Sequence, residues 1–61
     1  MEKFGAYKFR IFEGKNSPRW FYEIFNEKCV PIKLSKESFE YEGIARFAAI
    51  GHISLIEQGK G

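Results

Sequence analysis

Hydrophobic and polar side chains alternate along two stretches in the first half of the chain. In residues 6–13, Tyr7, Phe9 and Ile11 alternate with Lys8 and Arg10. A period of two is typical of a β-strand that turns one face towards a core. Residues 19–26 repeat the pattern, and the intervening "GKNSPR" is rich in turn-forming residues. The pattern therefore predicts two strands joined by a turn.

A third and shorter strand is predicted over residues 29–35, after a chain reversal at residues 26–28. Its apolar face would carry Val30, Ile32 and Leu34. Pro31 has no N–H group to donate to a neighbouring strand. The third strand is therefore expected at an edge of the sheet, or to begin after the proline.

The period changes to that of a helix from about Tyr41. Glu42 lies where the first turn of a helix favours an acid. At about 100° per residue, the apolar side chains fill an arc of roughly 180°: Ile44, Ala45, Ala48, Ala49, Ile53, Leu55 and Ile56. Gly51 could end the helix and release residues 52–57 as a fourth strand, but the arc continues in phase across it. One helix that stops near Gly59 is preferred.

These elements predict one α+β domain over residues 1–61, with the order β-β-β-α. A three-stranded antiparallel sheet would pack one face on the single C-terminal helix. The face expected in the core is nearly all apolar: Tyr7, Phe9, Ile11, Trp20, Tyr22, Ile24, Val30, Ile32 and Leu34.

The other face of this sheet is not covered by the helix, and it carries aromatic and basic side chains. The expected binding surface consists of Phe12, Phe21, Phe25, Lys8, Arg10 and Lys33. Aromatic and Arg residues are enriched in protein interfaces, and rings beside basic residues also stack single-stranded nucleic acid. A third interpretation is packing against the N-terminal segment through Phe4. A protein interface is preferred, with a homodimer as its simplest form.

A secondary surface is expected on the helix outside the core arc. It consists of Arg46, Phe47 and Ile50. Two apolar surfaces on opposite sides of so small a domain favour a partner that covers one of them.

Chain length and cysteine content limit what can stabilise the fold. A domain of 61 residues is only marginally stable alone, and small domains usually rely on disulfides, metals or partner subunits. The single Cys29 and the single His52 make a disulfide or a structural zinc site within one chain untenable. Association with a partner subunit is the remaining way to stabilise the domain. The unpaired cysteine and the absence of a long apolar run indicate a cytoplasmic protein without a membrane segment.

The charge distribution is uneven but mild. The net charge is +2. Residues 1–36 hold eight Lys/Arg and four Glu, and residues 37–61 hold two Lys/Arg and four Glu. This balance is small for strong phosphate binding, so single-stranded nucleic acid is the alternative partner.

The residue types present give little support for an enzymatic function. Asp is absent, so His52 has few candidates for the acidic group that would orient a general base. Cys29 lies beside Lys28, which lowers a thiol pKa only modestly. The sequence predicts a non-catalytic protein with no cofactor and no metal site.

Three segments carry a resemblance to a known family. "YKFRIFEG", "WFYEIFN" and "PIKLSKESF" resemble consecutive parts of the YegP-like family of small bacterial domains, with Ile32, Ser35 and Phe39 at matching places. The resemblance covers about residues 7–56 and departs from the family at "NEKCVP", where an Asn-Gly turn is usual, and at Gly51 and His52. It implies a bacterial or phage protein with the β-β-β-α order. Because that family has no established activity and often carries two tandem units, the resemblance also implies a homodimer.

Overall fold

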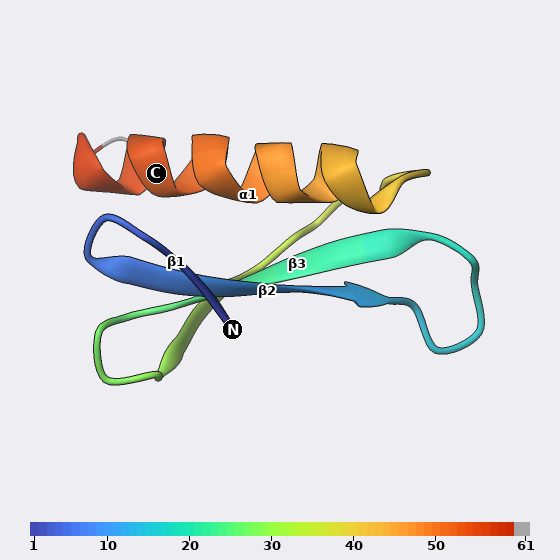
Figure 1. Ribbon diagram of the computed structural model, residues 1–61, viewed down its shortest axis with the longest axis horizontal. Coiled ribbons are helices and arrows are strands. Elements are labelled where there is room, and N and C mark those ends of the chain that lie inside the picture. The colour runs from blue at the N-terminus through green and yellow to red at the C-terminus, as the bar shows by residue number, and fades with distance from the viewer. Residues whose placement is uncertain (60–61) are drawn as a thin grey trace.

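Residues 1–59 of a computed structural model form one antiparallel sheet with a helix lying across one face (Figure 1). The strands are β1 (Glu2–Phe4), β2 (Tyr7–Glu13), β3 (Trp20–Phe25) and β4 (Pro31–Leu34), and the helix is α1 (Glu42–Glu57). The strand order is β1-β2-β3-β4, so each strand pairs with its neighbour in sequence. The expected α+β class, with an antiparallel sheet and one C-terminal helix, is confirmed.

The sheet has four strands, where the sequence pattern predicted three. The additional strand β1 pairs Glu2 with Phe9 and Phe4 with Tyr7. Gly5 makes the turn between β1 and β2 at a φ of 60°, a conformation that glycine adopts without a steric penalty. Three residues are too few to show an alternating pattern, and for this reason the periodicity missed β1.

The core lies between the helix and the two central strands. Phe9, Ile24 and Ile53 are almost completely buried, together with Ala45 and Ala49. The small alanines allow the backbone of α1 to approach the sheet closely. The helix continues to Glu57 through Gly51, so the preference for one helix is confirmed, and Gly59 follows it at a φ of 76°.

The buried arc of α1 is narrower than the sequence indicated. Ile44 and Leu55 were expected in the core arc, but they are 51% and 46% exposed. A helix that crosses a sheet contacts it along a line close to Ala45, Ala49 and Ile53, so side chains at the margins of a 180° arc remain in solvent.

The side chains of β4 point opposite to the prediction. Val30 precedes the strand and is 50% exposed, and Ile32 and Leu34 are 40% and 56% exposed rather than in the core. The pairing explains the difference for Leu34, because it lies opposite Glu23 on the side away from α1, while Lys33 lies opposite Ile24 on the helix side.

The cause is an irregularity in strand pairing between Ile24 and Phe25. An extra residue of this kind shifts the phase of every side chain beyond it. A prediction that counts alternate residues from Val30 therefore assigns the wrong face to β4.

The segment between β4 and α1 stays beside β3 and fixes Tyr22. The Ser35 N–H donates to the Tyr22 carbonyl (2.9 Å), and the Tyr22 N–H donates to the Ser35 hydroxyl (3.1 Å). Further on, Trp20 and Phe39 exchange two backbone hydrogen bonds of 2.8 and 2.9 Å. These contacts hold Tyr22 under the helix, where it faces the candidate groove described below.

Candidate interaction surfaces

The open sheet face, which lies opposite α1, brings together five of the six residues predicted for the binding surface. The register places Phe12 opposite Phe21, Arg10 opposite Glu23, and Lys8 opposite Phe25. The rings of Phe12 and Phe21 stack with their centroids 5.8 Å apart, and both side chains are half-buried. The three rings do not form an exposed patch, however, because Phe25 is only 8% exposed.

The basic groups of the open sheet face contact groups of the same chain. The Arg10 guanidinium lies 4.3 Å from the centroid of the Phe12 ring and forms an ion pair of 2.9 Å with Glu23. The Lys8 ammonium donates to the sulfur of Cys29 at 3.2 Å. The Arg10 guanidinium therefore lies over Phe12, and its charge is balanced by Glu23 within the sheet.

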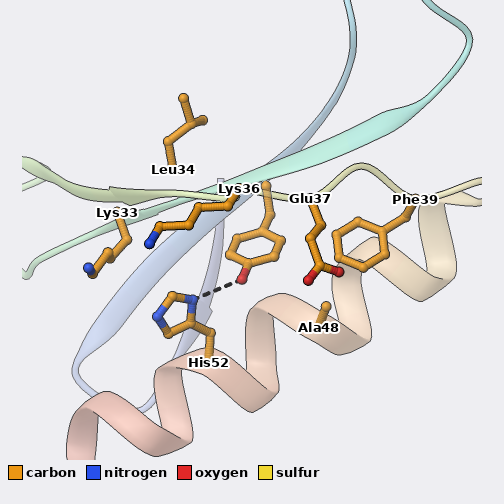
Figure 2. Close-up of a pocket in the computed structure, with 8 residues that line it drawn as sticks. Lys33, Leu34, Lys36, Glu37, Phe39, Ala48 and His52 are labelled. Atoms are coloured by element: carbon orange, nitrogen blue, oxygen red, sulfur yellow. Dashed lines mark hydrogen bonds between the residues drawn. The ribbon is translucent and has the colours of Figure 1, made fainter. Parts of the chain in front are cut away.

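Lys33 does not belong to the open sheet face. It lines a groove on the helix side, between β4, the segment that follows it and α1 (Figure 2). The groove has a volume of about 450 Å³, and its lining also includes Tyr22, Lys36, Glu37, Phe39, Ala48 and His52. Leu34 borders the groove with a side chain that points away from α1 (Figure 2). The binding surface predicted from the sequence is therefore divided between two sides of the sheet.

A Tyr–His pair lies at the base of this groove. The Tyr22 hydroxyl is 2.8 Å from Nδ1 of His52, and the two rings meet edge to face (Figure 2). On its other side, the Tyr22 ring stacks on Phe39, with a centroid distance of 6.1 Å. The structure thus places a side-chain hydroxyl beside the imidazole of His52.

Burial favours the neutral form of both members of this pair. Desolvation lowers the pKa of His52, and the nearby Lys33 charge lowers it further. Desolvation also raises the pKa of Tyr22, and the Glu37 charge acts in the same direction. In the tautomer that carries its proton on Nε2, the neutral imidazole accepts this hydrogen bond at Nδ1 from the Tyr22 hydroxyl. This bond occupies the Nδ1 lone pair and joins β3 to α1.

The side of α1 that faces away from the sheet forms a third surface. This outer helix face consists of Gly43, Ile44, Phe47, Gly51, Ser54 and Leu55. At about 100° per residue these positions share an arc of roughly 120°, and none is charged. Phe47 is 81% exposed and lies at the centre of the arc. A surface helix ordinarily carries charged or polar residues on this side, so the outer helix face is unusual for a solvent-exposed helix.

Two glycines leave room on the outer helix face. A Cβ atom added at Gly43 or Gly51 would meet no atom within 4 Å apart from the chain neighbours and the backbone of the helix itself. Neither glycine is therefore required by packing within the chain. Glycine in a helix costs about 1 kcal/mol relative to alanine, so the internal structure of the domain does not account for their presence.

The secondary surface predicted from the sequence separates into three different environments. Arg46 turns to the sheet edge, where it forms ion pairs with Glu2 (2.8 Å) and Glu42 (3.6 Å). Ile50 is half-buried and packs against the core, contrary to the expectation that it lies outside the core. Phe47 alone of the three projects freely. Sequence reasoning identified Phe47 but assigned its neighbours Ile44 and Leu55 to the core arc.

Comparisons with known proteins return no match to a family model, a curated protein or a solved structure. Within residues 1–59, no helix has the length and apolar character needed to cross a membrane. The same residues contain no cluster of three His, Cys, Asp or Glu side chains suited to holding a metal ion.

Proposed function

We propose that this protein is a non-catalytic interaction domain that contacts a protein partner through the outer helix face. The observation that carries the proposal is the 81% exposure of Phe47 at the centre of an uncharged helical surface. Full burial of a Phe side chain stabilises an assembly by about 1.5–3 kcal/mol. Large aromatic side chains at the centre of a contact are also typical of binding hot spots.

The open sheet face, which the sequence favoured, is a weaker candidate. Phe25 is already buried, and Phe12 and Phe21 cover part of each other. Arg10 lies over Phe12 and is paired with Glu23. These contacts cover part of each of the three predicted rings, whereas Phe47 on the helix is 81% exposed. The geometry therefore favours α1 as the principal contact surface.

The proposal is tested by the size of the particle that contains the protein in an extract of the cells that produce it. Sedimentation of a tagged chain is compared with that of Phe47→Glu and of the control Val30→Glu, which adds the same charge at an exposed position away from α1. We expect the wild type and Val30→Glu to sediment faster than a monomer, and Phe47→Glu to sediment as a monomer. Monomeric wild type, or equal behaviour of both variants, would overturn the proposed function.

A further inference from the structure

We infer that the partner on the outer helix face is a second copy of this chain, with the two helices antiparallel and a two-fold axis level with Ala49. This inference rests on the proposed function, because it names the occupant of the same surface. A two-fold contact uses one patch on both copies, so the patch must be complementary to itself. The outer helix face meets that requirement.

Side-chain size alternates on the outer helix face in a way that suits this symmetry. In an antiparallel pair centred at residue 49, positions equally far before and after it lie at the same level. Phe47 then lies level with Gly51 of the second copy, Ile44 with Ser54, and Leu55 with Gly43. Each pair combines one large and one small residue. A parallel pair would instead place Phe47 against Phe47 and Gly51 against Gly51.

The open space at Gly51 supplies the recess that a large side chain needs. Apart from its chain neighbours and the backbone of the helix itself, no atom lies within 4 Å of the position its Cβ would take. Helices pack with their axes about 8–10 Å apart, and small residues at the contact favour the lower value. The Phe47 ring of one copy can therefore fill the recess over Gly51 of the other. This arrangement gives the glycine a role that packing within one chain does not.

The outer helix face carries no charge that a second copy would have to cover. The positions of Arg46 and Glu57 lie about 80–100° from Phe47 around the helix, and Arg46 is paired with Glu2 and Glu42 of its own chain. No charged residue of the face itself has to be removed from water, which avoids a large desolvation cost.

The available area suits a small dimer. A Phe or Tyr side chain buries roughly 150–250 Å². Phe47, Ile44 and Leu55 of the outer helix face, with the adjoining Tyr41 that precedes α1 and is 64% exposed, therefore offer on the order of 500 Å² per copy. Two copies would then bury about 1,000 Å², the lower limit for a specific interface. This area is compatible with association in the micromolar range rather than with an obligate dimer.

A size-exchange experiment tests the inference with purified protein. Analytical ultracentrifugation gives the dimer dissociation constant of the wild type, Phe47→Ala, Gly51→Phe, and the double variant Phe47→Ala/Gly51→Phe. We expect each single variant to weaken the dimer about tenfold or more, because one removes the ring and the other fills the recess. The double variant should regain most of the affinity, since it exchanges the large and small positions across the two-fold axis. Failure of the exchange to restore binding would overturn the assigned register.

Disulfide trapping provides a second measurement that keeps Phe47 and Gly51 intact. Ile44→Cys and Ser54→Cys are made separately in a Cys29→Ala background, mixed in equal amounts and oxidised. We expect the mixed disulfide to predominate, because Cα atoms about 4.4–6.8 Å apart are needed for the bond and only the 44–54 pair lies at one level. Predominance of disulfides between identical variants would contradict the antiparallel arrangement. A purified wild type that stays monomeric at several hundred micromolar would exclude a second copy, while a Phe47-dependent complex in the extract would still support the proposed function.

Discussion

The hydroxyl of Tyr22 on β3 and Nδ1 of His52 on α1 are 2.8 Å apart, across the layer that separates sheet from helix. This bond is a polar contact at the edge of an otherwise apolar core. Its donor and acceptor roles depend on the imidazole tautomer, and burial favours the neutral ring. The stability of the domain is consequently sensitive to pH through a residue in the middle of its helix.

Stability is expected to fall as the pH is lowered from about 7.5 to 5.5. The pKa of His52 in the fold lies below its ordinary value of 6.5, so the unfolded chain binds the proton more readily than the folded chain. The stabilising contribution is complete above the unfolded pKa and is lost as the pH falls through the lower, folded pKa. Urea unfolding at several pH values in this range measures the slope.

The control for this prediction is His52→Gln, which cannot gain a proton in this range. Its free energy of unfolding should be nearly constant between pH 7.5 and 5.5. The Glu2 carboxyl, whose pKa is lowered chiefly by its hydrogen bond with Arg46, titrates below its ordinary value of 4.5 and so lies outside the range. Equal slopes for His52→Gln and wild type would show that another group causes the effect.

Tyr22→Phe should raise the pKa of His52 while leaving the stacked ring in place. Removing the hydroxyl removes the donor that favours the neutral imidazole. One hydrogen bond of this kind contributes about 0.5–1.5 kcal/mol to stability. NMR titration of the imidazole and urea unfolding at pH 7.5 measure the two effects. A pKa unchanged by the substitution would mean that the Tyr22 hydroxyl does not donate to His52 in solution.

Cys29→Gly is expected to stabilise the fold by about 0.5–1 kcal/mol. Cys29 has a φ of 64°, in the left-handed region that a side chain disfavours. Asn26 closes the same turn by accepting hydrogen bonds from the N–H groups of Lys28 and Val30. The midpoint of urea unfolding measures the change, and Val30→Gly is a control that has no positive φ to relieve. A destabilised Cys29→Gly would show that the Lys8–Cys29 contact outweighs the backbone strain.

Single-stranded oligonucleotides are expected to bind weakly and without base stacking on the sheet. Arg10 is paired with Glu23, and Lys33 lies on the helix side, so few cations of the open sheet face are available to phosphates. Affinity measured by fluorescence anisotropy should be unchanged by Phe21→Ala. A loss of about 1–3 kcal/mol in that variant, with a steep dependence on salt concentration, would instead support nucleic-acid binding.

The sequence predicted the parts of the fold that repeat a regular period over six or more residues. Phe9 and Ile24 lie in the core because β2 and β3 are long enough to alternate clearly. Ala45, Ala49 and Ile53 mark the buried line of α1 for the same reason. The burial of these residues follows from their local spacing, which can be seen in a single sequence.

The remaining features depend on contacts that spacing does not encode. The pairing irregularity at Ile24 and Phe25 reversed the side chains of β4 and removed Lys33 from the predicted surface. The burial of Phe25 was missed because it depends on how the strands are arranged around it. The sequence shows that the positions of the outer helix face carry no charge. Ile44 and Leu55 were nevertheless assigned to the core, because the predicted apolar arc is wider than the part of α1 that contacts the sheet.

The strand order has a consequence for how quickly the chain folds. Because β1, β2, β3 and β4 pair in sequence order, each strand pairing closes only a short loop and carries a small entropic cost. The helix is the exception, since Ile53 must reach Phe9 and Glu57 must reach Ala6. The sheet can therefore form hairpin by hairpin, and the docking of α1 is the step that closes the longest loop. Mixed α/β domains fold at rates between those of helical bundles and those of all-β domains, and the docking of α1 is expected to be the slowest step for this chain.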